Sequence, residues 1–263
     1  MKKNPFSEKD LAIYLEEKHD QYNRISFIDE DPVSIPHLFS KKEDIEISGL
    51  FAATLAWGQR KTIVSNSKKL MNLMDGDPHD FILNHTSSDL IRFEKFSHRT
   101  FNSADLIFFI RSIKNIYSKK AGLQGIFEKA VSVRDNNIGN GLILFRKKFF
   151  ELPHLKRTEK HISSPEKNSS CKRLNMFLRW MVRKDKRGVD FGIWTGIRAD
   201  QLICPLDVHS GRVARNLGLL YGKQNNWKAA LELTDNLKKI SAVDPVKFDF
   251  ALFGLGVNSK EKN

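Results

Sequence analysis

Cysteine is scarce in this sequence. Only Cys171 and Cys204 occur among its 263 residues. Two cysteines are too few for a disulfide framework, for a four-cysteine zinc site or for an iron–sulfur cluster. The sequence therefore predicts a protein of a reducing compartment, and we expect a cytoplasmic, nucleoid-associated location.

Long hydrophobic runs are also missing. No stretch approaches the roughly 20 apolar residues that a membrane-spanning helix needs. Lys2 and Lys3 stand near the start, but no apolar segment of the kind found in signal peptides follows them. We expect no membrane partner.

Metal-ligand spacing is the third absence. The eight histidines form no H-E-x-x-H pattern or comparable arrangement. We therefore predict neither a metal nor another cofactor, and a metal-dependent hydrolase built from scattered His and Asp residues is disfavoured.

Positive charge, in contrast, is abundant. The chain has 44 Lys and Arg against 31 Asp and Glu, a formal net charge of +13. The charges are mixed along the chain and form no separate tail, which favours a folded surface that binds a polyanion such as double-stranded DNA. The alternative is a basic surface that is merely solvated.

The hydrophobic pattern predicts an all-α protein. No alternating run is long enough to demand a sheet, whereas apolar residues recur at helical spacing in many segments. Ser7 and Asp77-Pro78 are typical helix starts. Helices are predicted over 8–22, 45–74 as one or two, 78–84, 103–119, 122–131, 138–151, 227–240 and 245–253.

Two further helix starts present an amine and a carboxylate. Ser169 and Ser170 precede Lys172, and the apolar positions from 174 to 181 then follow a helical repeat. Pro205 breaks the chain before Asp207, which is placed to cap the helix after it. Lys172 is therefore predicted in a first helical turn and Asp207 at an N-cap.

These stretches resemble the active-site segments of the helix-hairpin-helix DNA glycosylases of the endonuclease III superfamily (HhH-GPD). In that superfamily a lysine opens the second helix of the hairpin, and an aspartate begins a D-x-H-x-x-R-V pattern, which Asp207, His209, Arg212 and Val213 match. The 35-residue separation, 207 − 172, is more like the archaeal 8-oxoguanine DNA glycosylase branch. The closest resemblance is to an uncharacterised bacterial family related to that branch.

The resemblance implies a two-lobed, all-α helix-hairpin-helix fold with the active cleft between the lobes. Residues 41–198 would form one lobe, with the hairpin and the lysine helix. Residues 1–40 and 199–263 would form the other, with the aspartate helix. We expect a monomer.

The resemblance also implies roles for individual residues. Lys172 would be the nucleophile of a DNA glycosylase with AP lyase activity, and Asp207 would be its carboxylate partner. The enzyme would excise a damaged base, and oxidised purines are candidates for that base. Residues 55–61 resemble the superfamily's helix that ends in a DNA-inserting glutamine. The implied DNA contacts are Gln59, Arg60, Lys61, Lys167, Ser169, Ser170, Arg173 and Arg212, and the implied base pocket is Phe191 and Trp194.

One departure from the superfamily concerns the hairpin. Its loop usually carries G-x-G, which lets backbone amides approach a phosphate, whereas the equivalent stretch here, 165–170, has no glycine. This difference favours the main alternative function, a non-catalytic DNA- or RNA-binding protein that retains the hairpin fold.

Excision of a base from DNA through a Schiff base uses an amine and a carboxylate, independently of the resemblance. Cleavage of an N-glycosidic bond leaves an electron-poor sugar carbon, which a neutral amine captures as a Schiff base and a carboxylate stabilises electrostatically. The structural alternative is that Lys172 is a surface lysine and Asp207 merely a cap, while Phe191 and Trp194 are core residues.

Overall fold

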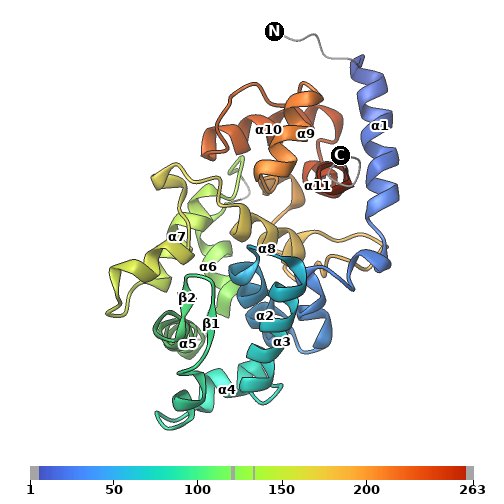
Figure 1. The fold of residues 1–263 in the computed structure, drawn as a ribbon. Coiled ribbons are helices and arrows are strands. Elements are labelled where there is room, and N and C mark those ends of the chain that lie inside the picture. The colour runs from blue at the N-terminus through green and yellow to red at the C-terminus, as the bar shows by residue number, and fades with distance from the viewer. Residues whose placement is uncertain (1–5, 120–121, 133, 259–263) are drawn as a thin grey trace. The chain divides into compact units, whose positions relative to one another are not determined.

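The computed structural model of the protein describes residues 6–119, 122–132 and 134–258 (Figure 1). It is predominantly helical, as the sequence predicts. The α-helices are α1 (Glu8–Tyr22), α2 (Lys42–Leu55), α3 (Arg60–Leu73), α4 (Pro78–Asn84), α5 (Ser103–Ser118), α6 (Gly122–Ala130), α7 (Gly139–Phe149), α8 (Lys172–Val182), α9 (Val208–Asn216), α10 (Trp227–Ile240) and α11 (Asp249–Asn258).

The predicted helix starts are confirmed where capping chemistry marked them. The Ser7 side chain accepts a hydrogen bond from the Asp10 amide at the start of α1. Asp77 caps α4 in the same way, with Pro78 at the first helical position. The predicted segment 45–74 is two helices, because residues 56–59 leave the helical conformation. Lys2 and Lys3 lie outside the described residues.

Short elements complete the fold. Strands β1 (Ser97–His98) and β2 (Phe101–Asn102) pair antiparallel as a small hairpin. Turns of 3-10 helix occur at Ile25–Phe27, Pro32–Ser34, Pro36–Leu38, Asp89–Phe93, Lys156–His161, Pro165–Lys167, Ala199–Gln201 and Pro245–Phe248. No helix of the described residues is long and apolar enough to cross a membrane.

The chain forms two compact units. Unit 1 contains residues 1–27, 133–139 and 164–263, and unit 2 contains residues 28–132 and 140–163. The division differs from the lobes predicted above, since residues 164–198, which include α8, belong with the C-terminal helices and not with 41–132. The reason is that α8 and the segment after it pair with residues that are remote in sequence: Lys172 with Asp207, Arg179 with Asp249 and Arg183 with Asp244.

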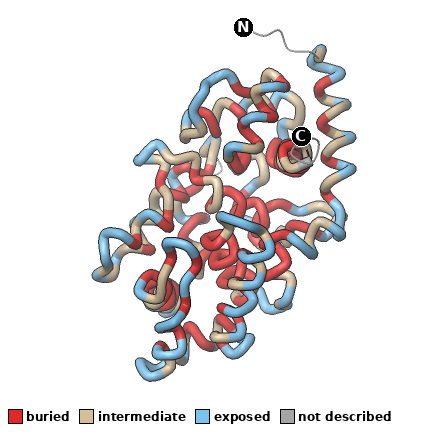
Figure 2. Tube along the Cα trace, in the orientation of Figure 1, coloured by how far each residue is buried: buried red, intermediate tan, exposed pale blue. Residues whose placement is uncertain are grey.

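Unit 1 has its core between α9, α11 and α1. α11 packs against both α9 and α1, and Leu11, Leu15 and His19 of α1 are buried. Figure 2 shows buried positions recurring along α1. The ring of Phe27 meets that of Phe250 edge to face. α8 contributes Phe177, whose ring packs on the buried Trp194.

Unit 2 is organised around α2. Every residue of this helix from Asp44 to Leu55 is buried. α3 and α4 pack against α2, and α4 also contacts α5. After α2 the chain reaches solvent at Gly58 and Gln59, directly before α3.

Candidate active site at the starts of helices α8 and α9

Lys172 and Asp207 lie together in unit 1. The Nζ atom of Lys172 is 3.8 Å from Oδ2 of Asp207, and each side chain is about a quarter exposed. The two residues are the first residue of α8 and the N-cap of α9. Two helix starts that are 35 residues apart thus place an amine beside a carboxylate that solvent can reach.

The two oxygens of Asp207 have different tasks. Oδ1 accepts hydrogen bonds from the amides of His209 and Ser210, at 2.8 and 2.9 Å. The Ser210 hydroxyl in turn accepts from the Asp207 amide, which completes a capping box. Because capping uses Oδ1, Oδ2 remains directed to Lys172, so the cap and the ion pair do not compete.

The loop before Lys172 turns without glycine. Asn168 and Cys171 both have positive φ, 55° and 52°, in the left-handed region that glycine and asparagine tolerate best. Within the predicted hairpin loop, 165–170, residues Pro165–Lys167 form a turn of 3-10 helix. The turn that glycines normally provide is therefore made here by an asparagine and a buried cysteine.

Hydrogen bonds join this loop to the segments that lead into α9 and α10. The Ser170 hydroxyl donates to the carbonyl of Leu206 at 3.0 Å, and Ser169 pairs with Asn226 as an isolated β-bridge. The amide of Trp227 also donates to the carbonyl of Asn168. These bonds fix the separation of the two helix starts.

Asn225 contacts Asp207 from the same segment. Its Nδ2 donates to the Asp207 carbonyl at 2.9 Å, while its Oδ1 accepts from Arg215 at 2.8 Å. A Cβ atom at Gly211 would lie 2.6 Å from that Oδ1, so glycine at this position gives Asn225 the room it occupies.

A buried second carboxylate stands behind the pair. Asp249, the first residue of α11, accepts a hydrogen bond from Arg179, which lies two turns after Lys172 on α8. Burial raises the pKa of Asp249 to about 6, against the opposing influence of Arg179 and Lys172. Burial also raises the pKa of the Cys204 thiol well above its usual value. Cys204 is thus a packed thiol and not a nucleophile.

The other predicted residues of unit 1 have varied environments. Arg212 is exposed, and its guanidinium donates to the carbonyl of Gly256 at 3.1 Å. Arg173 is half-buried, and burial lowers its pKa. Lys167 is exposed in the loop before α8.

The predicted base pocket residues differ in exposure. Trp194 is only 1% exposed, with its ring edge-on to Phe177 at 5.4 Å between ring centres, the environment of a core residue. Phe191 is half-buried, and its amide donates to the carbonyl of Trp180. Phe191 is thus the less buried of the two.

Gln59, Arg60 and Lys61 belong to unit 2. Gln59 is the N-cap of α3 and makes no side-chain capping bond, and both Gln59 and Lys61 are exposed.

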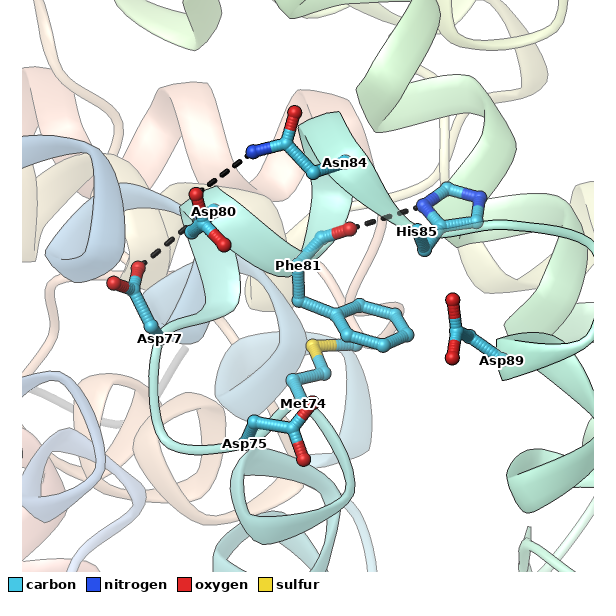
Figure 3. Close-up of a pocket in the computed structure, with 8 residues that line it drawn as sticks. All are labelled: Met74, Asp75, Asp77, Asp80, Phe81, Asn84, His85 and Asp89. Carbon is cyan, nitrogen blue, oxygen red and sulfur yellow. Dashed lines mark hydrogen bonds between the residues drawn. The ribbon is translucent and has the colours of Figure 1, made fainter.

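Unit 2 also contains an acidic hollow of roughly 180 Å³ (Figure 3). Its carboxylates are engaged with the protein itself: Asp75 and Asp89 pair with Arg92, and Asp77 caps α4. No group of three or more His, Cys, Asp or Glu side chains within the described ranges is arranged to hold a metal ion. The hollow therefore offers no obvious chemistry.

Sequence reasoning missed Asn225 and Asp249. A signal existed for Asp249, because a single carboxylate within the apolar run from Phe248 to Leu252 is expensive to bury and marks a special environment. No local pattern marks Asn225, whose partner Asp207 is remote in sequence.

Comparison with known proteins gives one match. Neither the curated proteins nor the solved structures contain a significant match to the chain. Residues 31–258 match a protein family described as "Protein of unknown function (DUF2400)". That stretch includes α8, α9 and the Lys172–Asp207 pair. Since it spans most of the sequence, the chain belongs to the DUF2400 family.

Proposed function

We propose that the protein is a DNA glycosylase with AP lyase activity, in which Lys172 is the nucleophile and Asp207 its carboxylate partner. The observation that carries the proposal is the 3.8 Å separation of Lys172 Nζ and Asp207 Oδ2 at the starts of two helices. The all-α fold, the net charge of +13 and the resemblance of the two segments to helix-hairpin-helix glycosylases support it.

The geometry suits each step of this chemistry. Lys172 attacks as the neutral amine after releasing its proton to solvent, so the Asp207 carboxylate keeps its negative charge. The amine then bonds to the sugar carbon as the glycosidic bond breaks, and the base leaves with the bonding electrons. While the sugar is electron-poor, the negative charge of Asp207 stabilises it. Loss of a proton from the neighbouring sugar carbon then expels the 3′ phosphate by β-elimination.

A damaged base is the proposed substrate, and oxidised purines are the first candidates because the separation of Lys172 and Asp207 resembles that of the 8-oxoguanine branch. We further propose a two-lobed helix-hairpin-helix arrangement, double-stranded DNA as partner, a monomeric state and a cytoplasmic, nucleoid-associated location. The proposed DNA contacts are Gln59, Arg60, Lys61, Lys167, Ser169, Ser170, Arg173 and Arg212.

A second candidate is a non-catalytic nucleic-acid-binding protein. The absence of glycine from residues 165–170 favours it, because a glycine-free loop brings side chains between the backbone amides and a phosphate. The positive φ angles of Asn168 and Cys171 count against this second candidate, because they show that the loop turns tightly although it has no glycine.

Borohydride trapping separates the two candidates. The wild-type protein should form a covalent adduct with a duplex that contains an abasic site, and Lys172→Gln should form none. Lys186→Gln is the matched control: Lys186 is an exposed lysine beyond the other end of α8, so its adduct yield should equal that of the wild type. Adduct formation by Lys172→Gln would exclude Lys172 as nucleophile and make Lys167 the next lysine to test. No adduct with the wild type would favour the binding protein.

A further inference from the structure

Arg99 occupies an unusual position in unit 2. It lies with Thr100 in the two-residue turn between β1 and β2 and is exposed. Its φ is 55°, in the left-handed region that costs a non-glycine residue about 1–2 kcal/mol. A turn that needed only this backbone shape would be better served by glycine or asparagine. The presence of arginine at this strained position therefore indicates that its side chain has a use.

The Arg99 side chain is held in one place. Its guanidinium carbon lies 4.5 Å from the centre of the Trp57 ring, within the range of a cation–π contact. A Cβ atom at Gly58, whose φ is +113°, would lie 3.1 Å from Nη1 of Arg99, so the loop beside Trp57 leaves room for the guanidinium. His98 bonds the carbonyl of Trp57, and Arg157 donates to the carbonyl of Thr100 at 2.8 Å. The turn and the Trp57 loop are thus braced together.

The charge of Arg99 is not compensated. No carboxylate lies within 4.0 Å of its guanidinium in the part of the chain that the structure describes. Arg92 provides the contrast within the same unit, since its guanidinium also lies over a ring, that of Phe81, but pairs with both Asp75 and Asp89. Stacking on Trp57 covers a face of the Arg99 guanidinium and leaves the N–H donors in its plane.

We propose that Arg99 on Trp57 is a phosphate-binding platform for a nucleic-acid backbone. A phosphodiester offers two oxygens to the in-plane N–H donors of a guanidinium, and the stack reduces the entropy lost when a long side chain binds. Gln59 and Lys61, both exposed, follow Trp57 by two and four residues, so the platform extends the basic start of α3. The identity of the polyanion rests on the proposed function above.

Duplex binding measured by fluorescence anisotropy over a range of salt concentrations tests the platform. Arg99→Gly removes the cation and also relieves the strained turn. We expect the melting temperature to stay level or rise, while affinity falls about five- to tenfold and the log–log salt slope becomes shallower by about 0.9, the value for one phosphate contact. Arg99→Lys should keep the slope and lose part of the affinity, because it keeps the charge without the planar stack.

Arg92→Ala is the matched control. Because Asp75 and Asp89 already neutralise Arg92, its removal should leave both affinity and slope unchanged. Wild-type affinity and slope in Arg99→Gly, or an equal loss in Arg92→Ala, would overturn the platform. Should Arg99→Gly fail to fold, Arg99→Gln decides by the same two measurements.

The outcomes also separate this inference from the proposed function. If the wild type binds duplex and is trapped through Lys172 while Arg99→Gly binds equally well, only the platform is wrong. If the wild type binds no duplex even at low salt, the proposed function fails and the platform with it.

Discussion

The side-chain amide of Asn225 donates a hydrogen bond to the backbone carbonyl of Asp207, with 2.9 Å between Nδ2 and the oxygen. The next residue, Asn226, pairs with Ser169 in the loop that precedes Lys172. One short segment therefore contacts both the carboxylate helix and the lysine loop, and it sets the distance between the two reacting groups.

Asn225→Ala should consequently slow the reaction more than it weakens binding. A shift of the order of 1 Å at a reacting pair can cost up to about a hundredfold in rate, and we expect a loss of about tenfold in single-turnover trapping at saturating protein. The matched control is Asn236→Ala, since Asn236 also donates from its side chain to a backbone carbonyl, that of Leu219, at 3.0 Å. Equal losses in both variants would mean that Asn225 acts through stability alone.

Asp207→Asn should separate the cap from the charge. Asparagine caps helices about as well as aspartate, so the melting temperature should remain close to that of the wild type. Base excision should fall by roughly 10²–10³, the usual cost of losing one electrostatic stabiliser. Asp207→Ala should in addition lose about 1 kcal/mol of stability with the cap. Single-turnover excision and thermal unfolding give the two readouts, and full excision by Asp207→Asn would assign Asp207 to capping only.

Duplex affinity should depend steeply on salt. Each phosphate neutralised by a protein cation contributes about −0.9 to the slope of log affinity against log salt concentration. A chain with a net charge of +13 has many Lys and Arg side chains that could make such contacts. Titrations between low and physiological salt measure the slope. A salt-independent affinity would contradict both the catalytic and the non-catalytic nucleic-acid proposals.

His19 should make unit 1 sensitive to acid. Burial and the nearby Arg183 lower the pKa of His19 to about 4 from 6.5, and its Nε2 lies 3.0 Å from the Asn23 amide and 3.4 Å from Arg183. Both neighbours are donors, so the folded state needs neutral imidazole. Its stabilising contribution is complete above pH 6.5 and decreases as the pH falls towards 4, by on the order of 3 kcal/mol.

Urea unfolding at pH 7, 6, 5 and 4.5 measures this dependence. His19→Gln keeps an acceptor but cannot be protonated, so it should lose less stability than the wild type over this interval. Asp249 contributes with the opposite sign, because a carboxyl pKa raised to about 6 stabilises the folded state as the pH falls. Since Asp249 is present in both proteins, their difference isolates His19. Parallel curves would show that His19 does not titrate as expected.

Local chemistry made much of the fold predictable. Ser7, the Asp77-Pro78 pair and Asp207 each marked a helix start within the sequence, and the structure places helices after all three. Lys172 and Asp207 were predictable as a pair because each stands at such a start and within a segment that resembles a known motif. Short-range sequence patterns were therefore enough to predict both the helices and the residues of the candidate site.

Contacts between remote residues were not predictable in the same way. The grouping of α8 with α9 depends on Ser170 and Leu206, and the placement of Asp207 depends on Asn225. Neither pair leaves a periodic pattern in the sequence. The hairpin at 97–102 was also missed, because strands of two residues are too short to show alternation.

Unit 1 takes its residues from three separate stretches of the chain, and its first helix packs on its last. Lys247 pairs with Glu16 at 2.6 Å, so α1 gains this partner only after residue 247 has been made. At about 5–20 residues per second, unit 2 leaves the ribosome several seconds before α11 does. During that interval Leu11 and Leu15 lack the surface of α11 that covers them in the folded unit, so the apolar side of α1 is open to a chaperone.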